Sequence, residues 1–368
     1  MRIVLWILVF SFPLSLFSWN FGGLEFYPAF LLIPFGFLQL FERLKENANY
    51  RMSHFSFGIL LLAILILFHA AAQSFLASDI LKLIVAILLY NSLIFLSKRL
   101  GLKILNILDY SICLLVLYGI FQIVASLSGY RELASSFNTW VRGAGEAIPI
   151  DTRGVGILDF MRVSSFTSEP SYFAFTVCVY FFLTESRITR FFCLIGIFIS
   201  LSFITLYSWT GMAVYQLTKK LRVPTPFFFI GAVIAHLIFA ATIYYEVPQK
   251  FFPTFYDRYA GIVEFLRFDW LQILFGSNNI DRSFPINLIR PYSNLGSILF
   301  LFGLLGLSIY IFLFRALEKE ATKPKAVIMI FLLMFNYYYL TSWPIIAGFL
   351  FLILQRKPVE DTLVSYEY

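Results

Sequence analysis

Long apolar segments recur along the whole chain and are separated by short polar stretches. A helix that crosses a bilayer needs about 20 mostly apolar residues, and twelve segments approach that length. The two shortest, 208–218 and 343–355, suit tilted or half-spanning helices. The predicted spans are 2–19, 23–41, 55–75, 79–97, 104–128, 170–184, 188–206, 208–218, 226–245, 293–315, 325–340 and 343–355. The pattern predicts one all-α domain over residues 1–368, a polytopic bundle of about 12 membrane helices.

Lysine and arginine residues gather at alternate ends of these segments. They follow the second, fourth, sixth, eighth, tenth and twelfth predicted spans, and Arg2 precedes the first. Because loops on the cytoplasmic side carry an excess of these residues, we expect both termini in the cytoplasm. Tryptophans favour membrane interfaces, and Trp19, Trp209 and Trp343 fall at predicted outer ends.

The composition supports a membrane protein and removes other classes. The 368 residues are 60% hydrophobic and 13% charged, whereas soluble domains are about half apolar and a quarter charged. A net charge of +7 would suggest nucleic acid, but the cations follow helix ends, so we expect no nucleic-acid partner. Cys113, Cys178 and Cys193 lie inside apolar runs, which predicts neither disulfides nor a metal site. No dinucleotide, phosphate-loop or metalloprotease motif occurs, and we expect no cofactor.

Two predicted outer loops are long, at about 129–169 and 246–292. Long loops in compact proteins usually carry function. Within the second loop, apolar residues at helical spacing predict an amphipathic helix on the outer surface. They are Phe255, Tyr259, Ile262, Leu266 and Trp270. A lid packed on the spans and a surface that contacts substrate are both open interpretations of this helix.

These outer loops contain eight arginines and one lysine. Guanidinium is always charged and binds phosphate or carboxylate through two parallel hydrogen bonds. Ordinary surface roles suit Arg131, Arg142 and Arg267, the last because it would pair with Glu264 three residues earlier. Of the other five arginines, we favour Arg162, Arg258 and Arg290 for anion binding.

Arg162 and Arg290 each lie shortly before a predicted helix start, at Pro170 and Pro291. Proline suits the first helical position, and helix N-termini attract anions. Glu169, directly before Pro170, has two interpretations that spacing alone leaves open. It caps the helix, or it accepts a proton from an attacking hydroxyl.

Five stretches, in this order, resemble the O-antigen polymerase and O-antigen ligase superfamily. They are RVSSFTSEPSYFA (162–174), LYSWTGMAV (206–214), YDRYAGIVEFLRFDWLQILFGSN (256–278), YSNLGSILFLFGLLGL (292–307) and LTSWPIIAGFLFLIL (340–354). The first combines an arginine with Glu-Pro-Ser at the start of a span. The resemblance covers about 150–350, whereas the first five spans match only in general character.

Two departures separate this chain from the superfamily that it resembles. Many of its members carry an arginine where Trp209 stands here. The ligases usually have a histidine in the second large outer loop, and 246–292 contains none. The resemblance therefore points to the polymerase branch rather than the ligase branch.

The resemblance implies a GT-C-like glycosyltransferase of the bacterial inner membrane, with its active site facing the periplasm. Donor and acceptor would both be oligosaccharide repeat units linked to undecaprenyl pyrophosphate, and the reaction would need no metal. Further partners would be membrane lipids and a chain-length regulator. The catalytic residues would be Arg162, Glu169 and Arg258. Substrate would contact Arg153, Arg282, Arg290, Tyr292 and Asn294.

Two alternatives remain open at this stage. An O-antigen ligase would transfer finished glycan to lipid A core. A transporter or flippase for lipid-linked oligosaccharide would require polar residues at mid-span and internal repeats. Lys82 and Asp109 lie near predicted span ends, and His236 is more simply a hydrogen-bonded core residue. We find no repeat.

Overall fold

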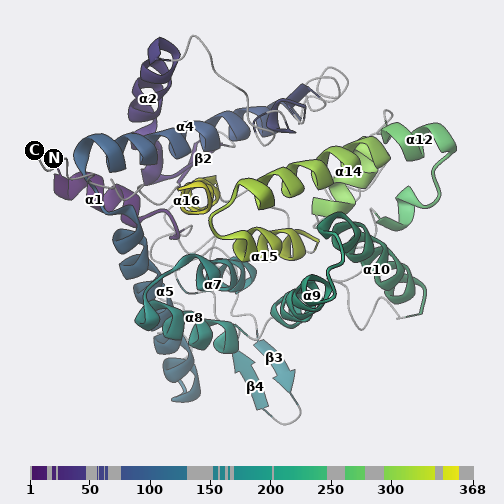
Figure 1. Cartoon of the computed structure of the whole chain (residues 1–368). Helices are drawn as coiled ribbons and strands as arrows, with labels where there is room; N and C mark the ends of the chain where they lie inside the picture. Colours follow the sequence, from purple (N-terminus) through teal and green to yellow (C-terminus); the bar gives the residue numbers. More distant parts are fainter. Residues whose placement is uncertain are drawn as a thin grey trace, which may run out of the picture.

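The computed structural model (Figure 1) describes residues 2–14, 19–21, 24–46, 56, 58–61, 63–64, 76–130, 152–155, 158–161, 165, 170–200, 203–246, 262–277, 294–335 and 343–355. These residues are predominantly helical. The helices are α1 (Arg2–Phe10), η1 (Pro28–Leu32), α2 (Ile33–Glu46), α4 (Leu76–Leu100), α5 (Ile104–Leu127), α7 (Pro170–Leu183), α8 (Arg187–Ile199), α9 (Phe203–Lys220), α10 (Thr225–Glu246), α12 (Trp270–Phe275), α14 (Asn294–Glu320), α15 (Pro324–Met334) and α16 (Trp343–Leu354). Two antiparallel hairpins pair β1 (Trp19–Phe21) with β2 (Leu24–Phe26), and β3 (Thr152–Val155) with β4 (Leu158–Met161).

Within the described residues, four helices are long and apolar enough to cross a bilayer. The segments are Leu81–Leu100, Ile104–Leu127, Thr225–Thr242 and Leu295–Glu320. They coincide with four of the spans that the apolar pattern predicts. The protein is therefore a membrane-embedded helical protein, as the sequence indicates.

Other predicted spans form shorter helices. In the first predicted span, 2–19, the nine-residue α1 ends at Phe10, and the strand β1 begins at Trp19. Pro13, shortly after α1, disfavours continuation of the helix. The apolar helices α7, α15 and α16 have 14, 11 and 12 residues. At about 1.5 Å per residue, none of these three crosses a hydrocarbon layer of about 30 Å alone. Within the described ranges, four of the twelve predicted spans are thus helices of spanning length.

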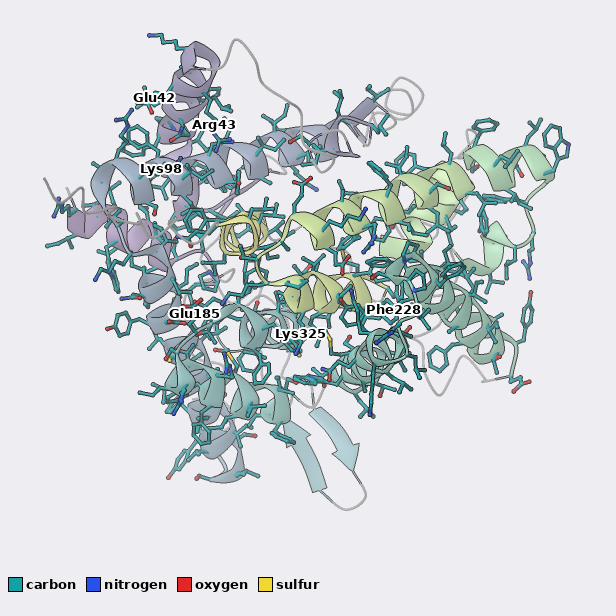
Figure 2. All side chains as sticks on the ribbon, viewed as in Figure 1. Glu42, Arg43, Lys98, Glu185, Phe228 and Lys325 are labelled. Atoms are coloured by element: carbon teal, nitrogen blue, oxygen red, sulfur yellow. The ribbon has the colours of Figure 1, made fainter. Side chains whose placement is uncertain are left out.

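Close backbone contact joins α2 to α4. A side chain at Gly36 would collide with the carbonyl of Leu88, so only glycine allows this approach. The hydroxyl oxygen of Ser92 lies 2.7 Å from the carbonyl oxygen of Leu32 in η1 and 2.8 Å from that of Leu88, and its single proton is shared between them. Figure 2 shows the charged end of the same pair, with Glu42 and Arg43 on α2 and Lys98 on α4. Glu42 forms an ion pair with Arg99, the residue after Lys98, at 3.2 Å.

The helix α15 forms the centre of the core. It packs against α7, α9 and α14, and Val327, Ile328 and Met329 are fully buried in succession. A helix that is apolar on all sides belongs inside a bundle. The ring of Phe331 lies edge-on to that of Phe229 on α10, with centroids 4.5 Å apart. Beside this centre, α16 packs against both α4 and α7 (Figure 1).

Several helix ends that the charge pattern assigns to one side of the membrane are joined by polar contacts. Lys323, in the turn between α14 and α15, binds Glu185 in the turn between α7 and α8 at 2.8 Å. In the same turn, the backbone N–H of Thr322 donates to the carbonyl of Ile353 on α16 at 2.9 Å. These contacts hold the ends of α7, α14 and α16 together.

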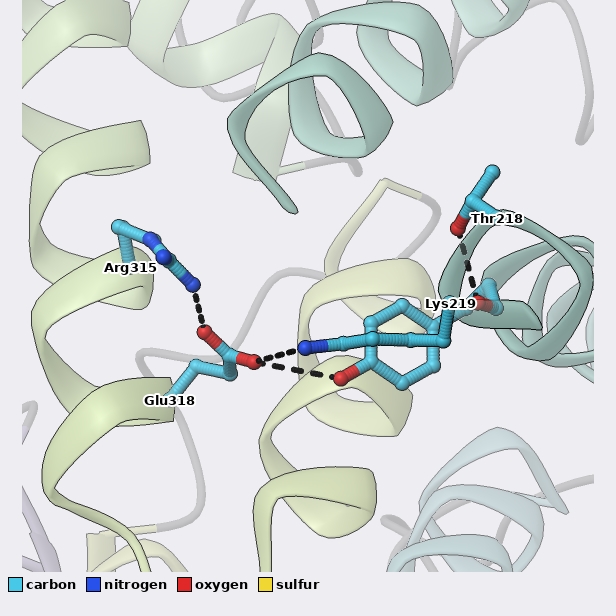
Figure 3. Close-up of polar contacts among 5 residues, drawn as sticks. Thr218, Lys219, Arg315 and Glu318 are labelled. Atoms are coloured by element: carbon cyan, nitrogen blue, oxygen red, sulfur yellow. Dashed lines mark hydrogen bonds and ion pairs between the residues drawn. The ribbon is translucent and has the colours of Figure 1, made fainter. Parts of the chain in front are cut away.

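A buried carboxylate links α9 to α14 (Figure 3). The side chain of Glu318 is only 6% exposed and forms an ion pair with Arg315 one turn earlier. It also binds Lys219 at 3.3 Å and accepts a hydrogen bond from the hydroxyl of Tyr215 at 3.2 Å. A buried carboxylate is costly unless such partners surround it.

Replacing Glu318 should therefore destabilise the protein more than replacing an exposed acid. Glu318→Ala leaves two cations without their carboxylate, and we expect a loss of about 1–3 kcal/mol. Glu185→Ala is the matched control, because that side chain is 60% exposed and such pairs contribute less than about 1 kcal/mol. Thermal unfolding of both variants in detergent measures the difference. Equal shifts in the two midpoints would contradict the assignment.

Candidate functional site

Two of the eight predicted site residues lie on described backbone. Arg153 belongs to β3, and Asn294 is the first residue of α14. The remaining six lie outside the described residues: Arg162, Glu169, Arg258, Arg282, Arg290 and Tyr292. The geometry around the site is therefore built from the elements that flank these positions.

A hairpin leads directly to the first motif. In the pairing of β3 with β4, Arg153 lies opposite Phe160, and Met161 ends the second strand. Arg162 is the next residue in the sequence. Figure 1 shows the hairpin projecting beyond the helices.

Ser165, within the first motif, is fixed to α5. It is fully buried and its φ is 51°, a left-handed conformation that few residues other than glycine adopt. Its backbone N–H donates to the side-chain oxygen of Gln122 at 2.8 Å, and its hydroxyl donates to the carbonyl of Leu115. Such backbone conformations persist only where the surroundings hold them, and they concentrate at functional sites.

The two contacts place Ser165 beside the part of α5 that is long and apolar enough to span a membrane. Leu115 and Gln122 lie about 17 Å and about 27 Å along this helix from Ile104. Both heights fall within a hydrocarbon layer of about 30 Å. In such surroundings a serine N–H has no water to bind, and the fully buried Gln122 supplies the acceptor instead.

The helix α7 starts at Pro170, as the sequence predicts, five residues after Ser165. Phe173 and Ala174 in its first turns are fully buried. At the other end, the hydroxyl of Thr184 donates to the carboxylate of Asp109 on α5 at 2.7 Å. The chain therefore contacts α5 both before the start of α7 and after its end.

Trp209 packs among aromatic side chains. Its ring packs against Phe181 and Phe182 of α7, with centroids 5.3 Å and 5.4 Å away. The indole thus joins α9 to α7 through aromatic contacts. An anion-binding role at this position finds no support.

His236 is a buried, hydrogen-bonded residue of the core. Its Nδ1 lies 3.1 Å from the hydroxyl of Tyr207 on α9, and its ring stacks on Phe335 with centroids 5.0 Å apart. The side chain is fully buried. The interpretation of His236 as a core residue is confirmed.

The predicted amphipathic helix of the second loop is wrong as a continuous element. Within 262–277 the chain turns at Leu266–Phe268, and Asp269 then caps the new helix α12 through a capping box with Gln272. Ile262 is fully buried, but Leu266 and Trp270 are 49% and 68% exposed. Asp269 caps and starts a new helix, so the residues of the predicted apolar face no longer lie along one side of a single helix.

The end of α12 packs into a break in α14. Gly303 has a φ of 59°, which interrupts the helix, and Gly276 has a φ of 82°. A side chain on Gly303 would lie 2.6 Å from the backbone nitrogen of Gly276, and one on Gly276 would collide with the carbonyl of Leu301. Two of the family-like stretches, 256–278 and 292–307, therefore meet backbone to backbone.

Arg267 has the ordinary surface role that its spacing predicts. Its guanidinium binds Glu264 at 2.8 Å, three residues earlier, and 54% of its side chain is exposed. The ion pair accounts for this arginine without any ligand. Arg267 is consequently a suitable control for the arginines assigned to substrate.

Sequence reasoning missed Gln122 and Ser165. The signal for Gln122 was available, because an amide inside the apolar segment 104–128 requires a partner. The identity of that partner was not available, since Ser165 lies 43 residues further along the chain.

No family model, curated protein or solved structure matches this chain. The candidate site therefore rests on the residues of the motifs and on the geometry that surrounds them.

Gln122 should matter more for stability than an exposed glutamine. Gln122→Leu leaves the buried N–H of Ser165 without this acceptor, at an expected cost of about 1–3 kcal/mol. Gln216→Leu is the control, because Gln216 is an exposed residue of the apolar helix α9. Thermal unfolding in detergent gives both values. Comparable stability of the two variants would remove the Gln122–Ser165 contact as an important tie.

The glycine crossing predicts sensitivity to a single methyl group. Gly276→Ala and Gly303→Ala both place a side chain on a left-handed backbone and against another backbone, so we expect markedly less folded protein. Gly231→Ala, on α10, has open space around it and should be neutral or stabilising. Size-exclusion chromatography of the detergent-solubilised protein compares the yields. Normal yields for both crossing variants would contradict the packing.

Proposed function

We propose that this protein is a membrane glycosyltransferase that polymerises oligosaccharide repeat units linked to undecaprenyl pyrophosphate. The product would be O-antigen or a related surface polysaccharide, made at the periplasmic face of the bacterial inner membrane. The finer topology belongs to the same proposal: about 12 spans, a GT-C-like arrangement and both termini in the cytoplasm.

The single observation that carries the proposal is the stretch Arg162–Ala174. It combines an arginine, a buried serine and Glu-Pro-Ser at a helix start. The arginine preference of the outer loops agrees with a pyrophosphate ligand, because guanidinium matches phosphate geometry and lysine does not. Four further stretches follow in the order expected for the superfamily.

The described residues of the motif are held by specific contacts. Ser165 is held by α5, and α7 begins at Pro170 with buried residues in its first turns. Catalytic groups act well only when their supporting residues hold them within about 0.5 Å of the productive geometry. Anchoring at Ser165, between Arg162 and Glu169 in sequence, suits that demand.

In the proposed reaction, a hydroxyl of the acceptor repeat unit attacks the anomeric carbon of the donor chain. A new glycosidic C–O bond forms while the bond from the anomeric carbon to the pyrophosphate oxygen breaks. Attack opposite the leaving group inverts the anomeric centre. Undecaprenyl pyrophosphate leaves, and its additional negative charge is the main feature that requires stabilisation.

The proposed roles follow from this chemistry. Arg162 and Arg258 stabilise the charge on the departing pyrophosphate, and Glu169 accepts the proton of the acceptor hydroxyl. Arg153, Arg282 and Arg290 contact the anionic part of the substrates. Tyr292 and Asn294 line the acceptor side, where α14 begins.

Chain-length analysis of the glycan in a strain without its native polymerase tests these roles. Arg162→Ala and Arg258→Ala should each lower polymerisation by roughly 100-fold or more. Glu169→Gln should also remove most activity, since a general base contributes roughly 100-fold or more. Arg267→Ala should retain the full ladder, because Arg267 is already paired with Glu264.

Immunoblotting must show equal protein in the membrane for all variants. A full-length ladder from both Arg162→Ala and Arg258→Ala would overturn the assignment. Full polymerisation by Glu169→Gln alone would reduce that residue to a helix cap. Glycan that elongates only in the presence of lipid A core would indicate a ligase instead.

A further inference from the structure

The helix α12 has an apolar face that is about half exposed in the described structure. Trp270, Leu271, Leu274 and Phe275 are 68%, 49%, 41% and 47% exposed. Four exposed apolar side chains on six residues would be unfavourable in water. Sequence topology nevertheless places α12 in a loop on the outer side of the membrane.

The contact with α14 fixes the level of α12. Gly303 lies roughly 18 Å along α14 from Arg315, and roughly 24 Å from Lys319, at about 1.5 Å per residue. Both lengths are shorter than a hydrocarbon layer of about 30 Å, and tilting the helix only lowers Gly303 further. With Arg315 and Lys319 at the inner surface, as the proposed topology has them, the contact of Gly276 with Gly303 puts the end of α12 below the outer membrane surface.

Hydrogen bonds at the crossing agree with a site in hydrocarbon. Non-helical backbone is tolerated at membrane depth only where the protein satisfies its polar groups. The break at Gly303 disturbs the helical bonding of α14, and the carbonyl of Phe300 accepts from the N–H of Ser277 at 2.9 Å. The N–H of Gly276 donates to the carbonyl of Gln272 at 2.7 Å. The chain just after α12 thus supplies a hydrogen-bond donor to a carbonyl group next to the break in α14.

The charged residues of this segment lie before α12, and the apolar residues of α12 and the glycine lie toward the other end. The Glu264–Arg267 ion pair and the capping carboxylate of Asp269 precede α12, whereas Phe275 and Gly276 end it. Trp270 begins the helix next to the acid, and tryptophan favours the boundary between headgroups and acyl chains. The charged end therefore faces the headgroups and the glycine end points into the bilayer.

We propose that residues 262–277 dip into the membrane and that the α12 face contacts the acyl chains of the outer leaflet. The segment reaches its deepest point at Gly276, within the break of α14. The partner of the exposed face is lipid, rather than water or another protein. This inference rests on the topology in the proposed function, and not on the glycosyltransferase activity.

Spin-label accessibility in proteoliposomes tests the inference. A nitroxide is attached at Leu274→Cys in a background in which Cys113, Cys178 and Cys193 are replaced by alanine. Molecular oxygen concentrates in acyl chains, whereas a water-soluble nickel chelate stays outside. Ile234→Cys, 51% exposed on the spanning helix α10, is the lipid control, and Lys220→Cys, at an exposed helix end, is the water control.

We expect the label at Leu274 to match Ile234, with high oxygen and low nickel accessibility. Nickel accessibility like that of Lys220 would overturn the proposal by placing α12 in water. Low accessibility to both reagents would also overturn it, because a second copy or another protein would then cover the face. Phe275→Cys, one residue further along, provides the same measurement if the first variant does not fold.

Discussion

Hydrocarbon offers no hydrogen bonds, so every polar group that this chain takes into a bilayer must find its partner within the protein. A regular helix satisfies the hydrogen-bonding groups of its own backbone, so other partners are needed where a helix stops. At Ser165 the N–H binds the amide of Gln122, and at the break in α14 the carbonyl of Phe300 binds Ser277. Each interruption is held by a specific partner from a distant part of the chain.

This constraint explains why the motifs lie where they do. The first family-like stretch is anchored to α5 by Ser165, and two others meet at Gly276 and Gly303. Short sequence similarities that look loose in isolation thus fall at positions where the backbone must be held.

The sequence predicts the local features best. The long apolar segments of the sequence correctly predicted α4, α5, α10 and α14, and Pro170 marked the start of α7. The continuous helix through Trp270 failed, because the capping box at Asp269 outweighs apolar periodicity over this short range. The Gln122–Ser165 contact could not be predicted, since a buried amide signals that a partner exists without identifying it. The roles of Arg162, Glu169 and Arg258 stay predictions, because these residues lie outside the described ranges.

The most direct measurement uses purified protein in liposomes with a defined oligosaccharide linked to undecaprenyl pyrophosphate. The products are separated by gel electrophoresis, and the leaflet position of the substrate is followed in parallel. A polymerase predicts a ladder of elongated glycans with release of undecaprenyl pyrophosphate, in the absence of lipid A core. Substrate that crosses the bilayer without any elongation would contradict the proposed function and indicate a transporter.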